Sequence, residues 1–362
     1  MRKKIFVVIG VLLLVAISIA IVQTSKFYPI LFQLLFNREI QLKKADSNIN
    51  ILLLGTGGGK HEGPDLTDTI IFASINEKEN KVTLISVPRD LWIPQLKSKV
   101  NMAYADSENK RQGRGIVLVR SVVEKILGVP IDYVVRIDFD GFVKVVDILD
   151  GIDVEVLNSF HDYEYPIAGK ERDPCGQKEE DLEMLATVSS QLEVFPCRYT
   201  TIHFDKGIQH MDGETVLQFV RSRHAKGDEG TDFARSKRQE QAIRAVKKKI
   251  FSFGLLLSPA KVVNLYSTLQ ESVNTNIKEG EFDDFVRLAQ KLKNAKIQSA
   301  VLDYGDEKTN RPGLLVNPQI SEEYDNHSVL IPRIGDGNFS EIQKYVECKI
   351  AIGNCPVKPI AE

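Results

Sequence analysis

Short apolar runs alternate with segments of helical periodicity in the first half of the chain, and this alternation restricts the fold more than any other feature. Apolar runs of strand character end at glycine, proline or polar residues, and residues 115–127 place apolar side chains along one helical stripe. Strands and helices that alternate in this way are typical of layered α/β domains. We therefore predict an α/β/α sandwich around a central mixed sheet, with strands at residues 50–55, 70–75, 82–87, 133–137 and 152–156.

The rest of the chain divides into a lobe, further helices and a tail. Residues 158–200 are rich in aromatic side chains, proline and cysteine, and we interpret them as a lobe inserted into one domain that spans residues 49–303. From residue 304 onward glycine, proline and asparagine dominate, so residues 304–362 are expected to form an irregular tail. Helices are predicted between the lobe and the tail, at residues 235–253, 259–272 and 282–292.

The N-terminus carries an uninterrupted apolar run, Ile5–Val22, directly after Arg2, Lys3 and Lys4. About 18 apolar residues are enough to cross the hydrocarbon core of a membrane. Positive charge before the run predicts a cytoplasmic N-terminus, a single transmembrane anchor and an extracellular body at the cell membrane. A cleaved signal peptide is the alternative, and the poor cleavage site after the run disfavours it. The predicted divisions are residues 1–4 (cytoplasmic), 5–23 (anchor) and 24–48 (juxtamembrane).

Four cysteines agree with an extracellular body, where disulfides persist. Cys175 and Cys197 flank one segment of the lobe, whereas Cys348 and Cys355 lie close together near the C-terminus. We predict two disulfides paired locally, although the sequence leaves other pairings open. A zinc site is the weaker alternative, because neither pair has Cys-x-x-Cys spacing.

The strongest functional signal is an arginine-rich stretch. An apolar run leads into Arg221 and Arg223, a loop with two glycines follows, and a helix is predicted to begin at Thr231 or Asp232. At about 100° per residue, one face of that helix carries an aspartate, an arginine and a glutamine, with a second arginine at its edge. These four residues are Asp232, Arg235, Gln239 and, at the edge, Arg238.

Such a cluster suits a phosphate or pyrophosphate ligand. The planar guanidinium group binds phosphate through two parallel hydrogen bonds and stays charged, and a helix start adds backbone amide donors. The alternative interpretation is a solvated helix face with surface ion pairs. A formal net charge of −2 argues against a nucleic-acid partner, which requires a basic excess.

A second group of candidates lies at strand ends. Asp68 opens the second strand, and Arg89 and Asp90 follow the third, where functional side chains commonly lie. We expect them to meet the arginine-rich stretch; the alternatives are a turn residue for Asp68 and a local ion pair for Arg89 and Asp90. The glycine-rich run before Lys60 is not a Walker A loop, because Lys60 is followed by His61 instead of serine or threonine.

Taken in order, these segments resemble the LytR-CpsA-Psr family of cell-wall ligases. The resemblance covers about residues 50–249, and each segment is weakly specific alone whereas their order is specific. The matching segments are the strand ending in Gly55, Asp68–Thr69, Ser86–Asp90, Lys99–Tyr104, Asp138–Phe142, Val146–Ile152, Gly207–Glu214, Phe219–Arg223 and Asp232–Gln239.

The resemblance implies a phosphotransferase that attaches a glycopolymer, carried on a polyprenyl pyrophosphate, to peptidoglycan. In that family a hydrophobic groove takes the lipid, and arginines with Mg²⁺ hold the pyrophosphate. Carried over by position, Asp68 is the metal ligand, Asp232 orients the arginines or acts as a base, and the catalytic set is completed by Arg89 and Arg235. The implied pyrophosphate-binding residues are Arg89, Arg221, Arg223, Arg238 and Gln239.

The chain departs from the family pattern at two positions. Gly57 stands where the family usually has an aspartate, and Leu66 stands where it usually has an arginine. A lost carboxylate weakens a Mg²⁺ site built from few protein ligands. His61, Glu62 and Asp65 are candidate substitutes. Two further hypotheses therefore stay open: a polyprenyl-pyrophosphate hydrolase, and a non-catalytic protein that binds the lipid carrier.

Overall fold

The computed structural model describes residues 40–45, 47–59, 63–111, 113–186, 190–250, 267–268, 272–306 and 311–357. The predicted transmembrane anchor lies outside these ranges, as do most of the juxtamembrane segment and most of the helix predicted at residues 259–272. In the part of the chain that is described, no helix is long and apolar enough to cross a membrane.

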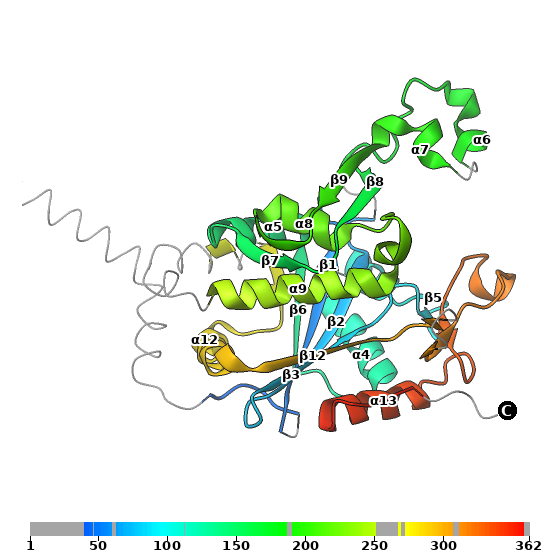
Figure 1. Ribbon diagram of the computed structural model, residues 1–362. Helices are drawn as coiled ribbons and strands as arrows, with labels where there is room; N and C mark the ends of the chain where they lie inside the picture. The colour runs from blue at the N-terminus through cyan, green and yellow to red at the C-terminus, as the bar shows by residue number, and fades with distance from the viewer. Residues whose placement is uncertain are drawn as a thin grey trace, which may run out of the picture.

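A six-stranded mixed sheet forms the centre of the molecule (Figure 1), in the order β11-β6-β1-β2-β3-β12. β1 runs parallel to β6 and β3 runs parallel to β12, whereas the other neighbouring pairs are antiparallel. The predicted α/β architecture with a central mixed sheet is therefore confirmed. The strands are β1 (Ile49–Thr56), β2 (Thr67–Asn76), β3 (Lys81–Ser86), β6 (Tyr133–Asp138), β11 (Val273–Thr275) and β12 (Lys296–Val301).

Successive side chains of the strands point to opposite faces, so each face receives its own core. On one face, Leu52 and Phe72 join a core with three helices: α3 (Met102–Lys110), α4 (Gly115–Leu127) and α13 (Ser340–Ala351). On the other face, Ile71 and Leu84 form a smaller apolar cluster with Ile243 of α9 (Asp232–Ile250). Near one end of the sheet, α12 (Phe282–Lys291) packs on Tyr133 of β6.

A second layer lies beyond α9. Strands β7 (Ile152–Val156) and β10 (Gly207–Met211) pair in antiparallel fashion, and their core includes residues of α5 (Phe139–Ile148) and α8 (Gly213–Arg221). Asp138 caps α5 by accepting from the amide of Gly141, and Asp212 caps α8 by accepting from Thr215.

The predicted lobe projects from this layer on two antiparallel strands, β8 (Phe160–Pro166) and β9 (Tyr199–Phe204) (Figure 1). Between them the chain forms short helices, α6 (Leu182–Ala186) and α7 (Gln191–Val194). A disulfide joins Cys175 to Cys197 across the base of this segment, and a second joins Cys348 to Cys355, as predicted. Because all four sulfurs are committed to these bonds, the zinc alternative is ruled out.

The prediction of an irregular tail after residue 303 is wrong. The tail contains α13 and the short strands β13 (Gly305–Asp306), β14 (Arg311–Pro312), β15 (Leu315–Val316) and β16 (Ile331–Pro332). β15 and β16 form an antiparallel pair. Another short antiparallel pair, β4 (Trp92–Ile93) with β5 (Ser98–Lys99), lies earlier in the chain. Ile342 and Val346 of α13 are buried in the main core. The helical spacing of these two residues was masked by the glycine- and proline-rich sequence before them.

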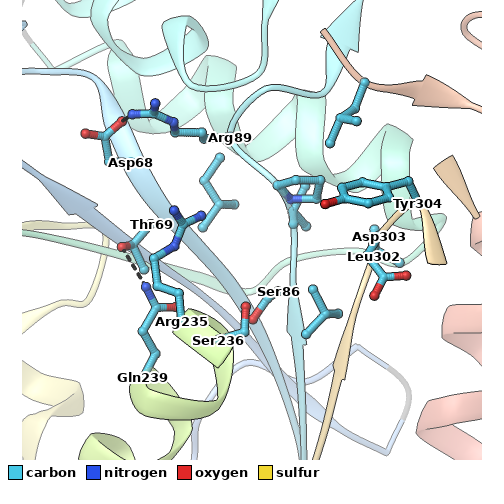
Figure 2. A pocket seen from close by; sticks show the side chains of 15 residues that line it. Asp68, Thr69, Ser86, Arg89, Arg235, Ser236, Gln239, Leu302, Asp303 and Tyr304 are labelled. Atoms are coloured by element: carbon cyan, nitrogen blue, oxygen red, sulfur yellow. Dashed lines mark hydrogen bonds and ion pairs between the residues drawn. The ribbon is translucent and has the colours of Figure 1, made fainter. Parts of the chain in front are cut away.

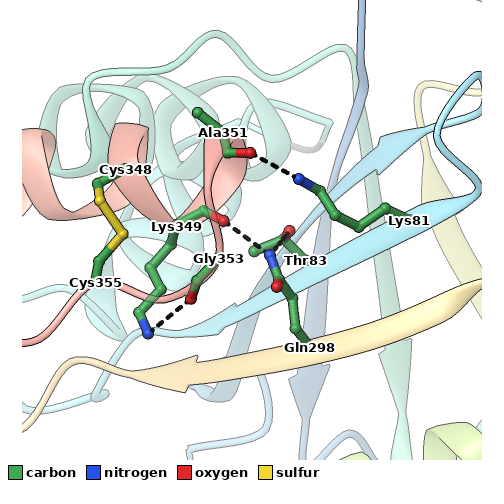
Figure 3. The surroundings of a disulfide bond; sticks show 8 residues. All are labelled: Lys81, Thr83, Gln298, Cys348, Lys349, Ala351, Gly353 and Cys355. Atoms are coloured by element: carbon green, nitrogen blue, oxygen red, sulfur yellow. Dashed lines mark hydrogen bonds between the residues drawn. A yellow bond between two sulfur atoms is a disulfide. The ribbon is translucent and has the colours of Figure 1, made fainter.

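Polar contacts fasten α13 to the edge of the sheet (Figure 3). The Gln298 amide donates to the carbonyl of Lys349 at 2.8 Å and to the Thr83 hydroxyl at 2.7 Å, and the Lys81 amine donates to the carbonyl of Ala351 at 3.1 Å. The Cys348–Cys355 disulfide links the last turns of α13 to the segment that follows the helix. The C-terminal segment is therefore part of the domain.

Candidate functional site

A pocket lies where β2, β3 and β12 meet the first turns of α9 (Figure 2), and we call it the arginine pocket. Each of these elements contributes side chains from its end nearest the pocket, which is why residues far apart in the sequence meet there. The pocket is lined by Asp68, Thr69, Ile70, Ser86, Val87, Pro88, Arg89, Arg235, Ser236, Gln239, Val301, Leu302, Asp303, Tyr304 and Leu330.

The charged edge of the arginine pocket is a chain of ion pairs. Arg89 donates through Nη1 to Asp68 Oδ1 at 2.7 Å, and its Nε lies 3.4 Å from Asp90 Oδ2. Lys99 donates to the other oxygen of Asp90 at 2.7 Å. Burial alone would lower the pKa of Arg89, but the two carboxylates outweigh it and raise this pKa, so Arg89 stays cationic. A fixed cation therefore stands at the pocket edge.

The charge of Arg223 also affects Asp90 in this chain of ion pairs. Burial opposes ionisation of Asp90, but the hydrogen bond from Lys99 and the charges of Arg89, Lys99 and Arg223 lower the pKa of Asp90. The loop that carries Arg223 therefore lies close to the end of β3. The predicted meeting of Asp68, Arg89 and Asp90 with the arginine-rich stretch is found in the structure.

The start of α9 presents two of the predicted residues to the pocket. The Thr231 hydroxyl caps the helix by accepting from the amide of Ala234 at 3.2 Å. Figure 2 shows the Arg235 side chain reaching from α9 toward Thr69 and Arg89. Gln239, one turn later, donates to the Thr69 hydroxyl at 3.3 Å. The side chain of Asp232 lies outside the described residues, so its predicted role stays a prediction.

Arg238 does not line the arginine pocket, contrary to the predicted contact with pyrophosphate. It is 2% exposed, and it donates to the carbonyl of Ser222 at 2.7 Å, to the carbonyl of Glu229 at 2.9 Å and to the Glu229 carboxylate at 3.0 Å. Its guanidinium carbon also lies 4.8 Å from the centre of the Phe160 ring. Burial lowers the pKa of Arg238 despite the nearby Glu229. Arg238 thus holds both ends of the loop after α8 instead of facing a ligand.

Arg221, the last residue of α8, lies against aromatic rings. Its guanidinium carbon is 4.0 Å from the centre of the Phe139 ring, and Nη1 donates to the Tyr165 hydroxyl at 3.4 Å. Stacking on a ring fixes the plane of a guanidinium group without using all of its donors. Arg221 is outside the arginine pocket as lined above, so its predicted contact with pyrophosphate also stays a prediction.

The sequence interpretation missed Asp162, which shapes the loop between Arg221 and His224. This carboxylate is 1% exposed, and its Oδ2 accepts from the Ser222 hydroxyl at 2.7 Å and from the amides of Arg223 and His224 at 3.0 and 3.1 Å. A buried carboxylate is tolerated when donors surround it in this way. The one sequence signal was an acidic residue at an inward position of strand β8, between aromatic neighbours.

A second pocket adjoins the arginine pocket between α9 and the sheet, and we call it the α9 groove. The two share Ser86, Ser236 and Val301. Further along, the groove is lined by Ile71 and Leu84 of the sheet and by α9 and β12, and its full lining is Ile71, Leu84, Ser86, Ser236, Lys237, Glu240, Ile243, Ser299, Ala300 and Val301. A pocket that contains two arginines therefore adjoins a groove whose floor is apolar and whose rim carries Lys237 and Glu240.

Comparisons with known proteins identify the family. The LytR_cpsA_psr family matches residues 25–322. The chain belongs to this family. It is 30% identical over 240 residues to the polyisoprenyl-teichoic acid–peptidoglycan teichoic acid transferase TagU of Bacillus mycoides, an alignment that covers 65% of this chain and 62% of that protein.

Solved structures agree on the fold of the LytR_cpsA_psr family. The crystal structure of Bacillus subtilis TagV matches with a TM-score of 0.54 and 22% identity, covering 85% of this chain and 98% of that one. The structure of TagT bound to LIIa-WTA matches with a TM-score of 0.52 and 20% identity, covering 86% and 95%. At these identities the likeness concerns the fold alone.

Asp68 is the residue at the pocket edge that could hold Mg²⁺, and its Oδ1 already accepts from Arg89. The Asp68 side chain is 40% exposed at the pocket edge, and Mg²⁺ is commonly held by one or two carboxylates together with substrate phosphates and water. Three residues were suggested as substitutes for the aspartate that is missing at Gly57. Of these, Asp65 forms an ion pair with Arg136, with 3.4 Å between Oδ1 and Nη2. His61 and Glu62 lie outside the described residues.

Elsewhere in the described ranges, one group of three potential metal ligands lies within mutual reach, formed by Asp173 with Cys175 and Cys197. Both of its sulfurs belong to the disulfide, so this group cannot replace the site at Asp68.

Proposed function

We propose that this protein is a membrane-anchored extracellular phosphotransferase that attaches a glycopolymer from a polyprenyl-pyrophosphate carrier to peptidoglycan. The observation that carries the proposal is the junction of the arginine pocket with the α9 groove. A polyprenyl pyrophosphate has a strongly anionic head on an apolar chain, and this junction offers Arg89 and Arg235 beside a groove with an apolar floor that includes Ile71, Leu84 and Ile243. A soluble phosphate ester would require only the cations.

The names of the relatives support the same reaction. The TagU protein of Bacillus mycoides is named as a transferase of teichoic acid from a polyisoprenyl carrier to peptidoglycan, and TagT has been solved with LIIa-WTA bound. The matched region covers 62% of that TagU protein, and we propose the same type of transfer for this chain. The apolar run at residues 5–22 supports an anchored protein whose body lies outside the cell.

In the proposed reaction, a hydroxyl of the peptidoglycan sugar attacks the phosphorus that bears the glycopolymer. A new P–O bond forms to that hydroxyl oxygen, the P–O bond to the lipid phosphate breaks, polyprenyl phosphate leaves, and the hydroxyl proton passes to water. Arg89 and Arg235 hold the pyrophosphate and neutralise the charge that accumulates on the departing phosphate. Mg²⁺ held by Asp68 would supply further positive charge to the same oxygens when bound.

A non-catalytic lipid-binding protein is the second candidate, because Gly57 replaces a carboxylate that the family usually has. Such a protein would keep the arginine pocket and the α9 groove but would not turn the carrier over. The two candidates differ in one observable, which is the joined product.

The test uses the full-length protein in lipid nanodiscs, supplied with a polyprenyl-pyrophosphate glycan and peptidoglycan oligosaccharides, with Mg²⁺ or with a chelator. Mass spectrometry identifies the products. We expect a joined glycan that disappears with chelator, and a large loss of transfer for Arg89→Ala and Arg235→Ala. Arg120→Ala is the matched control, since Arg120 is a partly exposed arginine (41% of its side chain) paired with Glu124 on α4, outside the pocket lining.

Three results would contradict the proposal. Bound carrier with no product under either condition would identify a binding protein. Free glycan released in the presence of acceptor would identify a hydrolase. Transfer that survives both arginine substitutions would show that the pyrophosphate binds elsewhere.

A further inference from the structure

One large aromatic side chain stands exposed at the edge of the arginine pocket. Tyr304 follows β12, lines the pocket and is 60% exposed. Figure 2 shows Tyr304 and Asp303 on one side of the pocket and Asp68, Thr69 and Gln239 on the other. Because most of this residue lies in solvent at the pocket edge, folding uses little of its ring, and the ring is available to a ligand.

The backbone on both sides of Tyr304 is held firmly. The carbonyl of Asp303 accepts from the amides of Leu314 and Leu315 at 2.9 and 3.0 Å, and its carboxylate accepts two hydrogen bonds from Arg311 at 3.1 and 2.7 Å. On the other side, Gly305 has a φ of +87°, and a Cβ there would approach the carbonyl oxygen of Arg311 to 2.4 Å. The tyrosine ring is therefore carried on a rigid turn, as a binding residue should be.

Tyr304 gives the pocket two unlike walls. On its side the aromatic face of Tyr304 lies beside Asp303, whereas the opposite side carries the polar side chains of Asp68, Thr69 and Gln239. A phosphate group uses only the charged wall, and a polyprenyl chain uses only an apolar one. A sugar ring matches both, because its C–H face packs on the electron-rich face of an aromatic ring and its hydroxyl edge hydrogen-bonds with polar groups.

The position of the α9 groove decides which sugar lies there. The groove leaves the pocket at Ser86, Ser236 and Val301, and Tyr304 is not among its lining residues. In phosphoryl transfer the attacking and the departing oxygens lie roughly in line on opposite sides of phosphorus. If the lipid phosphate departs toward the groove, the attacking hydroxyl must enter from the part of the pocket that the groove does not share, where Tyr304 lies.

We propose that Tyr304 is the stacking platform for the sugar ring of the acceptor glycan, and that it presents the attacking hydroxyl to the phosphorus. This inference rests on the function proposed above and adds the site of the second substrate. Tyr304 acts by stacking, so its ring is required and its phenol hydroxyl is not. The donor carrier, held by the arginines and the groove, is bound independently of Tyr304.

The test compares Tyr304→Ala and Tyr304→Phe with the wild-type protein in nanodiscs. Tyr163→Ala is the matched control, because Tyr163 is another exposed tyrosine (40%) that lies on strand β8 outside the pocket lining. We expect Tyr304→Ala to raise the KM for a soluble peptidoglycan oligosaccharide about tenfold while the donor KM stays unchanged, the loss of one aromatic stacking contact. Tyr304→Phe and Tyr163→Ala should keep the wild-type acceptor KM.

Binding without turnover gives an independent reading. Saturation-transfer NMR with the same oligosaccharide should show contact with the wild type and with Tyr304→Phe but not with Tyr304→Ala. An unchanged acceptor KM and unchanged NMR contact in Tyr304→Ala, in a wild type that transfers glycan, would overturn this inference alone. A wild type that neither binds the donor nor transfers would overturn the proposed function. Equal rises of donor and acceptor KM would show a structural role instead.

Discussion

Replacement of Asp162 should loosen the Arg221–His224 loop by an amount that the structure allows us to calculate. In Asp162→Ala, the Ser222 hydroxyl and the amides of Arg223 and His224 lose their shared acceptor. An orphaned buried donor costs about 1–3 kcal/mol. Ser222 is fully buried, but the other two residues are partly exposed, so water can replace part of the loss. We expect a decrease of about 3 kcal/mol in the free energy of unfolding.

Asp162→Asn is the matched control, because it keeps the shape and one carbonyl oxygen. That oxygen can face the three donors of the loop, which leaves the new amide group against the amide of Glu164, now 3.0 Å from Oδ1. One hydrogen bond is lost instead of the four that Asp162→Ala removes, so we expect a decrease of about 1 kcal/mol. Ser222→Ala removes a single donor and should cost a similar amount.

The single tryptophan makes the measurement direct. Trp92 is buried in edge-to-face contact with Tyr324, so its fluorescence reports on unfolding of the domain in urea. Hydrogen exchange at the amides of Arg223 and His224 should accelerate in Asp162→Ala before global unfolding. A free energy of unfolding for Asp162→Ala within about 1 kcal/mol of wild type, or one higher than that of Asp162→Asn, would refute this reasoning.

Three further predictions concern other parts of the domain. Arg238→Ala should lower the free energy of unfolding by about 3 kcal/mol, because it removes the cation buried against Glu229. Arg235→Ala should keep the wild-type unfolding midpoint and weaken the binding of inorganic pyrophosphate. Equal stabilities of the two variants would contradict the assignment of Arg238 to the loop and of Arg235 to the pocket. The lowered pKa of Asp90 means that its ionised form stabilises the fold above a pH of about 4 and that this contribution is lost as the pH falls further. The stability gap between wild type and Asp90→Asn should therefore close in acid, and a gap that persists in urea melts at low pH would refute it. Replacing Cys348 and Cys355 by serine opens a loop with a sequence separation of 7 and should cost about 2.5 kcal/mol, read as a lower urea midpoint with faster exchange in α13; an unchanged midpoint would argue against it.

Most of the sheet could be predicted from the sequence because its pattern is local. β1 and β2 contain unbroken apolar runs, Ile51–Leu54 and Ile70–Ala73, since both faces are covered there, and β7 alternates strictly between buried and exposed residues. The caps at Asp212 and Thr231 were equally local, because each accepts from an amide three residues later. Such features need no information about distant parts of the chain.

The remainder of the site depends on distant partners. Asp162 is 60 residues from Ser222, so nothing in its surroundings in the sequence marks it as the acceptor for that loop. Arg238 was placed at the edge of the binding face by its helical angle, but the angle could not show that the loop carrying Glu229 folds over it. Tyr304 was assigned to an irregular tail, because the sequence does not show that β12 and the end of β3 form a pocket beside it.

The arginine-rich stretch therefore encodes a binding surface together with its support. Arg235 and Gln239 face the arginine pocket, whereas Arg238, between them in sequence, faces the loop that positions Arg221 and Arg223. Loss of Arg238 should displace those two arginines and reduce transfer without removing any group that contacts the substrate. A screen of activity alone would thus assign Arg238 to the pocket, and only a parallel measurement of stability distinguishes an arginine that binds the pyrophosphate from one that holds the binding loop.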